Sequence, residues 1–132
     1  RALAFGDVSA RQRLEAILHP MIGTEALRQA AQAGTRPVVF DVPLLSASSP
    51  WRQRVDRLLV VDCSEDRQVQ RVMQRSGWTD EQVRRVVAQQ VPRAARRAIA
   101  DALIHNDDLS LDALRLEVQS LWLLWGGLPT GL

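Results

Sequence analysis

Residues 57–66 read Arg-Leu-Leu-Val-Val-Asp-Cys-Ser-Glu-Asp, and this stretch joins an apolar run to the start of a helix. Short apolar runs rich in β-branched residues are typical of strands that are covered on both faces. Ser64 can cap the following helix by accepting a backbone hydrogen bond, and the acids Glu65 and Asp66 favour its positive end. The stretch therefore predicts a strand over residues 57–62 and a helix over about 66–75.

Two further segments resemble strands, residues 38–42 (Val-Val-Phe-Asp-Val) and residues 102–106 (Ala-Leu-Ile-His-Asn). Helical patterns precede, separate and follow them, over residues 10–18, 21–33, 79–90 and 92–100 and from Ser110 onward. His19-Pro20 is expected to interrupt the first helical stretch, because a residue before proline disfavours the α region. Strands that alternate with helices predict an α/β fold with a parallel sheet and helical cover.

Composition fits a single domain, with 132 residues and a net charge of +2. Every basic residue is arginine, whose planar fork of donors matches phosphate oxygens. Cys63 is the only cysteine, which excludes an intrachain disulfide and fits a reducing compartment. The longest apolar stretch, near residues 121–125, is far shorter than the ~20 residues of a membrane span. We expect a soluble cytoplasmic protein with no membrane partner.

Arginines are concentrated between the second and third predicted strands, and they are the first candidates for a site. Those within residues 71–97 are Arg71, Arg75, Arg84, Arg85, Arg93, Arg96 and Arg97. Together they could converge on a polyphosphate and neutralise the charge that develops in phosphoryl transfer. The alternative is a solvated face on which each arginine pairs with a neighbouring acid such as Asp66, Asp80 or Glu81.

Few other side chains suggest chemistry. Asp41 ends a predicted strand, where a carboxylate can reach Mg²⁺ or cap a backbone donor. Asp62 occupies a similar strand end, and there a structural role is favoured. His19 could contact a ligand or cap a helix end, whereas His105 is expected to be a packed or surface residue. The sequence shows no metal-ligand spacing, and Cys63 has no adjacent histidine to activate it.

Several blocks, taken in order, resemble dephospho-CoA kinase. They are residues 14–20 (LEAILHP), 41–45 (DVPLL), 55–62 (VDRLLVVD), 70–75 (QRVMQR) ahead of Gly77, 88–90 (AQQ), 96–101 (RRAIAD) and 104–106 (IHN). Their order and spacing hold from about Phe5 to Asp108. The resemblance implies transfer of the γ-phosphoryl group of ATP to the ribose 3′-hydroxyl of dephospho-CoA, with Mg²⁺, on a P-loop kinase fold.

The resemblance also implies that different segments of the chain form different functional regions. Residues 1–35 would be substrate-side helices, residues 36–63 and 101–132 the core strands and C-terminal helix, and residues 64–100 a helical lid. On that template Arg71, Arg75 and Arg97 would face the phosphates of ATP and Asn106 would lie near the adenine. His19 and Asp41 would lie on the dephospho-CoA side.

The sequence departs from the family in several respects. Ser46 and Ala47 follow Leu45 where an aromatic and an acidic residue are common, Arg75-Ser76 stands where an Arg-Asp pair is common, and the largest departure concerns the phosphate-binding loop. The sequence contains no lysine and no Gly-x-x-x-x-Gly-Lys-Ser/Thr loop, and it begins at Arg1. We therefore expect an incomplete kinase domain that lacks the first strand and the P-loop and is inactive alone. The absent strand would leave a gap in the sheet between residues 38–42 and 58–62. We expect one of three outcomes. Another chain fills the gap by strand exchange or self-association, the sheet is rearranged, or the missing segment lies outside this sequence.

Three other readings remain open. One is a different P-loop nucleotide kinase, against which the His19-Pro20 and Pro43-Leu44-Leu45 blocks argue. Another is a non-catalytic, arginine-rich nucleic-acid-binding module. The small net charge and the lack of a recognised binding motif argue against it, so we expect no nucleic-acid partner. The last is a structural remnant without activity of its own.

Overall fold

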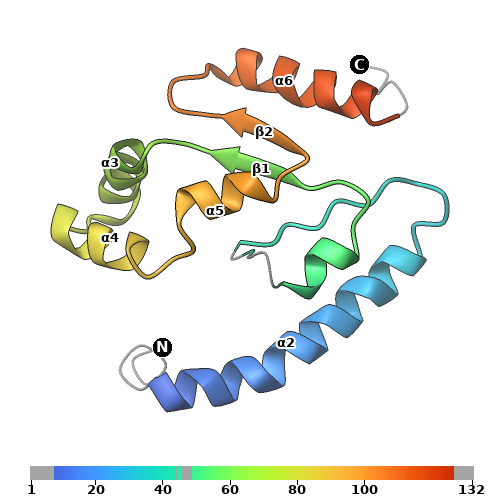
Figure 1. The fold of residues 1–132 in the computed structure, drawn as a ribbon, viewed down its shortest axis with the longest axis horizontal. Coiled ribbons are helices and arrows are strands. Elements are labelled where there is room, and N and C mark those ends of the chain that lie inside the picture. Colours follow the sequence, from blue (N-terminus) through green and yellow to red (C-terminus); the bar gives the residue numbers. More distant parts are fainter. Residues whose placement is uncertain (1–7, 44, 46–48, 127–132) are drawn as a thin grey trace. The chain divides into compact units, whose positions relative to one another are not determined.

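A computed structural model describes residues 8–43, 45 and 49–126. It divides the chain into two compact units, Arg1–Asp41 and Val42–Leu132, which we describe separately. Helices and one small parallel sheet make up the described structure (Figure 1), which confirms the expected α/β class.

The first unit contains one long helix, α2 (Val8–Ala31), which runs without interruption through Pro20. The expected break at His19-Pro20 is therefore wrong. Proline removes one backbone donor, but the hydrogen bonds of the turns before and after it remain, so a helix can continue past it. A tight turn follows α2, and Gly34 there adopts a φ of 64°, which glycine tolerates without steric cost.

Residues 37–42 follow that turn, and the structure assigns no strand to them. The prediction of a strand over residues 38–42 is wrong. Val38 and Val39 are 42% and 84% exposed, whereas a strand of the expected kind would bury both. Strand structure depends on hydrogen bonds to a neighbouring strand, and an apolar β-branched pattern does not supply that neighbour.

The second unit is organised around two parallel strands, β1 (Leu59–Asp62) and β2 (Ala102–His105). Leu59 pairs with Ala102 at one end, and Asp62 pairs with His105 at the other. Both strands were expected, within two residues of these bounds. Ahead of them lies the short 3-10 helix η1 (Pro50–Gln53).

Asp101 fixes the amino ends of both strands. Its Oδ2 accepts a hydrogen bond from the Leu58 N–H at 2.7 Å, and its Oδ1 lies 3.2 Å from Arg52 Nη2. The backbone N–H of Asp101 in turn donates to the Leu58 carbonyl at 2.9 Å. The start of β2 is thereby tied to the start of β1.

Three helices connect the strands: α3 (Glu65–Ser76), α4 (Asp80–Val87) and α5 (Arg93–Ala98). The predicted cap of α3 is confirmed, and α4 is capped in a similar way. Ser64 accepts from the Arg67 N–H, Gly77 ends α3 in the left-handed region, and Thr79 forms a capping box with Gln82. Helix α4 ends at Val87, three residues before the expected end, because residues 88–90 form a turn.

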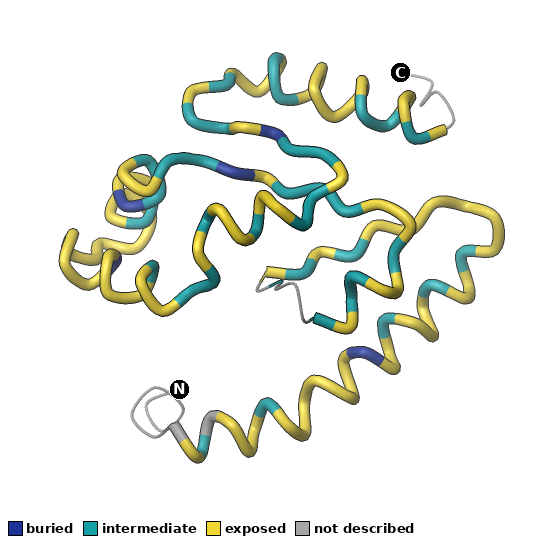
Figure 2. The backbone as a smooth tube through the Cα atoms, viewed as in Figure 1, coloured by how far each residue is buried: buried dark blue, intermediate teal, exposed yellow. Residues whose placement is uncertain are grey.

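The buried apolar core of the described residues is small, as Figure 2 shows. Val69 on α3, Val83 on α4 and Ile104 on β2 are its buried hydrophobic side chains. Of the three interstrand helices, α5 packs directly on the sheet, against β1, while α3 and α4 pack on each other.

The last helix, α6 (Leu111–Leu124), begins where expected, directly after Ser110, whose hydroxyl accepts from the Ala113 N–H. Its apolar face is only partly covered. Leu114, Leu121 and Trp125 are half-buried, but Leu111 is 74% exposed. Within the described ranges, no helix is both long and apolar enough to cross a membrane.

Candidate phosphate-binding site

The carboxyl ends of β1 and β2 lie side by side because the strands are parallel and in register. This places Asp62, the last residue of β1, next to His105, the last residue of β2. Among the described residues, Asp62 is the one buried charged side chain, with about 2% of it exposed. A buried carboxylate requires a compensating partner, so the groups around Asp62 define the site.

Arg93 is that partner. Its Nε lies 2.8 Å from Asp62 Oδ1 and 3.0 Å from Oδ2, and its Nη2 lies 2.7 Å from Oδ2. Arg93 is the first residue of α5, directly after Pro92, and α5 packs against β1. The proline thus starts the helix at the position from which an arginine reaches the strand end.

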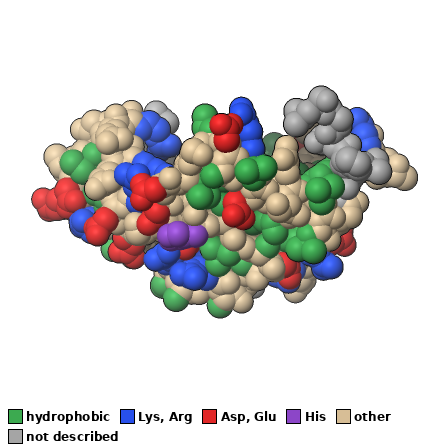
Figure 3. Space-filling model, turned by 90° about the horizontal axis from the view of Figure 1, so that it is seen from above, with side chains coloured by type: hydrophobic (Ala, Val, Ile, Leu, Met, Phe, Trp, Pro, Cys, Tyr) green, Lys and Arg blue, Asp and Glu red, His purple; other side chains and the backbone are tan. Residues whose placement is uncertain are grey.

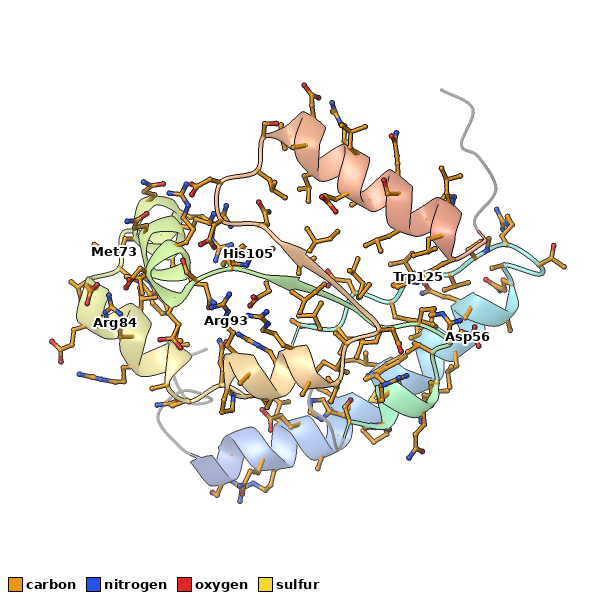
Figure 4. All side chains as sticks on the ribbon, turned by 45° about the horizontal axis from the view of Figure 1, so that its top comes forward. Asp56, Met73, Arg84, Arg93, His105 and Trp125 are labelled. Atoms are coloured by element: carbon orange, nitrogen blue, oxygen red, sulfur yellow. The ribbon has the colours of Figure 1, made fainter. Side chains whose placement is uncertain are left out.

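Two more groups approach the same carboxylate. Arg97, one helical turn after Arg93, places its Nη1 3.9 Å from Asp62 Oδ2 and remains 51% exposed. His105 places Nδ1 3.4 Å from that oxygen and Nε2 3.5 Å from Asp107 Oδ2. Figure 4 shows Arg93 and His105 close together at this end of the strands.

These contacts change the acidity of the groups involved. The hydrogen bonds from Arg93 lower the pKa of Asp62, with smaller contributions from His105 and Arg97. The same pair raises the pKa of Arg93. The carboxylate of Asp107 also has a lowered pKa, chiefly because the Ser64 N–H donates to it at 2.7 Å. Asp62 and Asp107 are therefore ionised, and Arg93 is charged, at neutral pH.

Helix α3 contributes two arginines to the loop that follows β2. The Arg67 Nε donates to the Asp107 carbonyl at 2.7 Å, and Arg71 Nη2 donates to the same oxygen at 3.0 Å. Arg67 also forms an ion pair with Asp108. The loop after β2 is thereby held against the amino-terminal half of α3, beside the Asp62 cluster.

The arginines of α4 behave differently. Arg84 binds Asp80 and Asp66, each at 2.9 Å, and these contacts, first those with Asp80, raise its pKa. Arg85 binds Glu81 at 2.8 Å. All of these side chains are exposed. On α4 the arginines therefore form ion pairs with neighbouring acids on a solvated face, which was the alternative to phosphate binding. Figure 3 shows the same intermixing of basic and acidic side chains on the surface.

The structure brings together three of the six predicted site residues. Arg97 belongs to the Asp62 cluster, and Arg71 contacts the adjoining loop. Asn106 follows His105, and its N–H donates to the Asp62 carbonyl at 2.7 Å. Arg75 lies one turn beyond Arg71 at the far end of α3, exposed, and makes no ion pair with any described residue.

His19 and Asp41 lie in the first unit, and both side chains are exposed. His19 is inside α2, not at a helix end. Asp41 follows an irregular segment, not a strand, so the structural reason for expecting a ligand there does not hold.

Sequence reasoning missed the centre of the site. It favoured a structural role for Asp62 and a packed or surface position for His105, and it did not distinguish Arg93 from its neighbours. Asp62 and Arg93 are 31 positions apart, and no spacing rule links residues at that separation. Pro92 was the one available signal, because it predicts a helix start and thereby sets which arginine comes first.

Mg²⁺ does not fit the described residues by themselves. Both carboxylate oxygens of Asp62 accept from Arg93, and no group of three or more His, Cys, Asp or Glu side chains among the described residues could hold a metal ion. We therefore derive no step through a metal at this site.

A parallel α/β unit with arginines gathered at the carboxyl ends of its strands defines a class of domain that binds phosphorylated ligands at that edge. Comparison with known families identifies the family within this class. The family model described as dephospho-CoA kinase matches residues 1–112. This chain belongs to the dephospho-CoA kinase family, as its ordered sequence blocks indicated.

Curated relatives support the assignment. Dephospho-CoA kinase of Burkholderia thailandensis is 54% identical over 121 residues, which is 92% of this chain and 60% of the relative. The corresponding proteins of Albidiferax ferrireducens and Bordetella pertussis are 50% and 47% identical, over 92% and 96% of this chain and 58% and 61% of theirs. The chain thus spans about three fifths of the length of the curated relatives it matches.

A solved structure shares the fold. The crystal structure of TT1252 from Thermus thermophilus matches with a TM-score of 0.78 and 27% sequence identity. The match covers 96% of this chain and 65% of that one. The likeness therefore extends over both units and supports the kinase-like α/β architecture that the sequence predicted.

Proposed function

We propose that the complete protein transfers the γ-phosphoryl group of ATP to the ribose 3′-hydroxyl of dephospho-CoA. The observation that carries the proposal is the gathering of Arg93 and Arg97 around Asp62 at the strand ends, in a chain of the dephospho-CoA kinase family. Phosphoryl transfer develops charge on phosphate oxygens, and fixed guanidinium groups stabilise that charge.

Each predicted residue receives a role in this proposal. Arg71, Arg75 and Arg97 bind the phosphates of ATP from the lid region, residues 64–100, and Arg93 joins them. Asn106, which directly follows β2 at the same strand ends, contacts the adenine. His19 and Asp41 contact dephospho-CoA from the first unit, residues 1–35 being the substrate-side helices.

The phosphate-binding loop is the part that these residues do not supply. The chain contains no lysine, so a Gly-x-x-x-x-Gly-Lys-Ser/Thr loop and its Mg²⁺ site must come from residues outside this sequence. Mg²⁺ is proposed as a cofactor of the complete protein, where it would neutralise charge on the nucleotide. We expect the 132-residue chain alone to bind the nucleotide weakly and to catalyse nothing.

The setting follows from the substrates. Both are small molecules, so we propose no nucleic-acid and no membrane partner, and a cytoplasmic location. Cys63 is a free thiol, which accords with a reducing compartment. Self-association or strand exchange is proposed for the 132-residue chain by itself, and size-exclusion chromatography of that chain would reveal it.

The test uses the complete product of the gene that contains this sequence. ATP and dephospho-CoA are supplied, and coenzyme A is measured by mass spectrometry. Replacement of Arg97 by alanine should raise KM for ATP by roughly tenfold, the value of one charge-assisted hydrogen bond. Arg115→Ala is the matched control, because Arg115 is an exposed arginine on α6 that pairs with Asp112.

The same protein separates the rival functions. Phosphorylation of nucleoside monophosphates in place of dephospho-CoA would indicate a different nucleotide kinase. Binding to random duplex DNA that weakens steeply with salt would indicate the nucleic-acid module. An Arg97→Ala variant with the KM of the wild type would remove Arg97 from the site.

A further inference from the structure

Asp62 differs from the other partly buried carboxylates of the second unit in what it contacts. Asp101 and Asp107 each accept a backbone N–H, from Leu58 and Ser64 respectively, and so hold main chain in place. Within the described residues, the carboxylate of Asp62 accepts from no backbone group. Its contacts are all with side chains, and these come from α5 and β2.

The contact with Arg93 leaves much of the guanidinium available. Asp62 engages Nε and Nη2, which form one edge of the planar group. Nη2 also lies 3.4 Å from His105 Nδ1, whereas Nη1 forms no hydrogen bond or ion pair with a described residue. The arginine side chain is 29% exposed. Five N–H donors are present on arginine, so an edge remains that can bind a second anion.

Arg97 extends the same surface. It lies 3.9 Å from Asp62 Oδ2, beyond hydrogen-bond distance, and half of its side chain is exposed. The single negative charge of Asp62 therefore faces two permanent positive charges, and His105 adds a third when it is protonated. Asp107, on the other side of His105, balances part of this charge.

A buried carboxylate in this position restricts the rotamers of the arginine that it binds. A free arginine samples many conformations, and ordering it on ligand binding weakens affinity. Two parallel hydrogen bonds set both the position and the plane of the guanidinium group before a ligand arrives. The ligand then meets a donor edge that is already oriented.

We propose that Asp62 is a positioning residue, which orients Arg93 and, through charge, Arg97 to bind the polyphosphate of ATP. The inference rests on the proposed kinase function and deepens it. It assigns to Asp62 no contact with substrate. Arg93 makes the phosphate contact through Nη1, the nitrogen that the carboxylate does not engage.

The test is steady-state kinetics of the complete gene product with Asp62→Asn. Asparagine keeps the size of the side chain but loses its charge and one acceptor. KM for ATP should rise by about tenfold, while KM for dephospho-CoA and kcat stay within about twofold. Asp62→Glu restores the charge and should recover part of the affinity for ATP.

Asp101→Asn is the matched control. Asp101 also pairs with an arginine, Arg52, but at the opposite ends of the same two strands. The control should lower the thermal midpoint without changing KM for ATP. If KM for ATP rises in Asp62→Asn but not in Asp101→Asn, the rise is not a general effect of lost stability.

A second variant decides the matter if Asp62→Asn does not fold. Arg93→Lys keeps the positive charge but cannot form two parallel hydrogen bonds with a carboxylate. It should raise KM for ATP as Asp62→Asn does. Calorimetric titration with inorganic tripolyphosphate should show the same loss, because the proposed contact involves the phosphates alone.

Two results would overturn the inference, and they are distinguishable. An active wild-type protein in which Asp62→Asn or Arg93→Lys retains the wild-type KM for ATP would reject the positioning role and leave the kinase function intact. A wild-type protein that neither binds ATP nor phosphorylates dephospho-CoA would reject both.

Discussion

Asp62 is a buried carboxylate that remains charged because hydrogen bonds from one arginine stabilise it. Removing a carboxylate from water is unfavourable unless hydrogen bonds replace the lost hydration. Arg93 supplies these bonds, and its own side chain stays in contact with solvent at 29% exposure. The pair therefore holds α5 on β1 without burying the arginine.

The lowered pKa of Asp62 makes its contribution to stability depend on pH. The pKa in the folded protein lies below the ordinary value of 3.8, so folding favours the ionised form. The stabilisation is fully present above about pH 4 and is lost as pH falls through the lower, folded-state pKa. Asp62→Asn should accordingly lower the urea midpoint at pH 7 and at pH 5, and the deficit should shrink at pH 3.

The measurement is urea unfolding of both proteins at the three pH values, followed by circular dichroism. Asp112→Asn serves as a control, because Asp112 is an exposed acid whose partner, Arg115, is also exposed. An Asp62→Asn deficit that stayed constant from pH 7 to pH 3 would contradict the assigned cause.

The sequence predicted little of this arrangement at the residue scale. It placed Asp62 at the end of a strand, which is correct, and it placed His105 inside a strand that ends one residue later than observed. The roles of both residues depend on which side chains approach them. The approach of Arg93 follows from where α5 begins and how it packs on β1. Those are tertiary facts, and neither is encoded in the residues adjacent to Asp62.

Gly77 ends helix α3 by adopting a backbone conformation that other residues rarely take. Its φ of 67° lies in the left-handed region that costs other residues about 1 kcal/mol or more. A Cβ atom at this position would meet no atom within 4 Å. The cost of Gly77→Ala is therefore backbone strain alone, and we expect about 1 kcal/mol less stability.

The prediction is checked by urea unfolding of the 132-residue chain. Ser76→Ala is the control, since Ser76 is the last residue of the same helix and is exposed. It should change stability by a few tenths of a kcal/mol at most. Equal effects of the two substitutions would show that the left-handed conformation of Gly77 is not what matters.

Elements whose limits are set by local chemistry were predicted well. Ser64 caps its helix as expected, and Thr79 and Ser110 cap theirs in the same way. Each hydroxyl accepts a hydrogen bond from a backbone N–H only three residues away, so such a cap can be recognised from local sequence. The element that failed, residues 38–42, depends on a partner elsewhere. Local sequence identifies a segment that can become a strand, and pairing decides whether it does.

At the scale of the whole molecule, the expected class is confirmed, and the small parallel sheet places the site at its carboxyl edge. Strand alternation with helices was enough to predict this, because parallel strands require helical crossovers. The two-unit division was not predicted, since nothing in the composition marks a boundary near Asp41.

Apolar side chains remain exposed on the last helix, and they predict a property of the chain in solution. Leu116, Leu123 and Leu124 of α6 are 63%, 58% and 76% exposed. The folded 132-residue chain should therefore enhance the fluorescence of 1-anilinonaphthalene-8-sulfonate. Leu116→Gln with Leu124→Gln should reduce the signal without lowering helix content.

The comparison is made in buffer and again in 6 M guanidinium chloride, where the dye should not bind. Absence of dye fluorescence in buffer, with native circular dichroism, would show that these leucines are covered in solution.

The parallel pairing of β1 with β2 also determines when the sheet can form during synthesis of the polypeptide. Leu58 and Asp101, which bond at the start of the pair, are 43 positions apart. A ribosome adds roughly 5–20 residues per second, so β1 emerges about 2–9 seconds before its partner strand exists. During that interval α3 and α4 can form, since helices need only local contacts and microseconds. The nascent chain must therefore carry the apolar strand Leu59–Asp62 unpaired, within reach of chaperones, until His105 has left the exit tunnel.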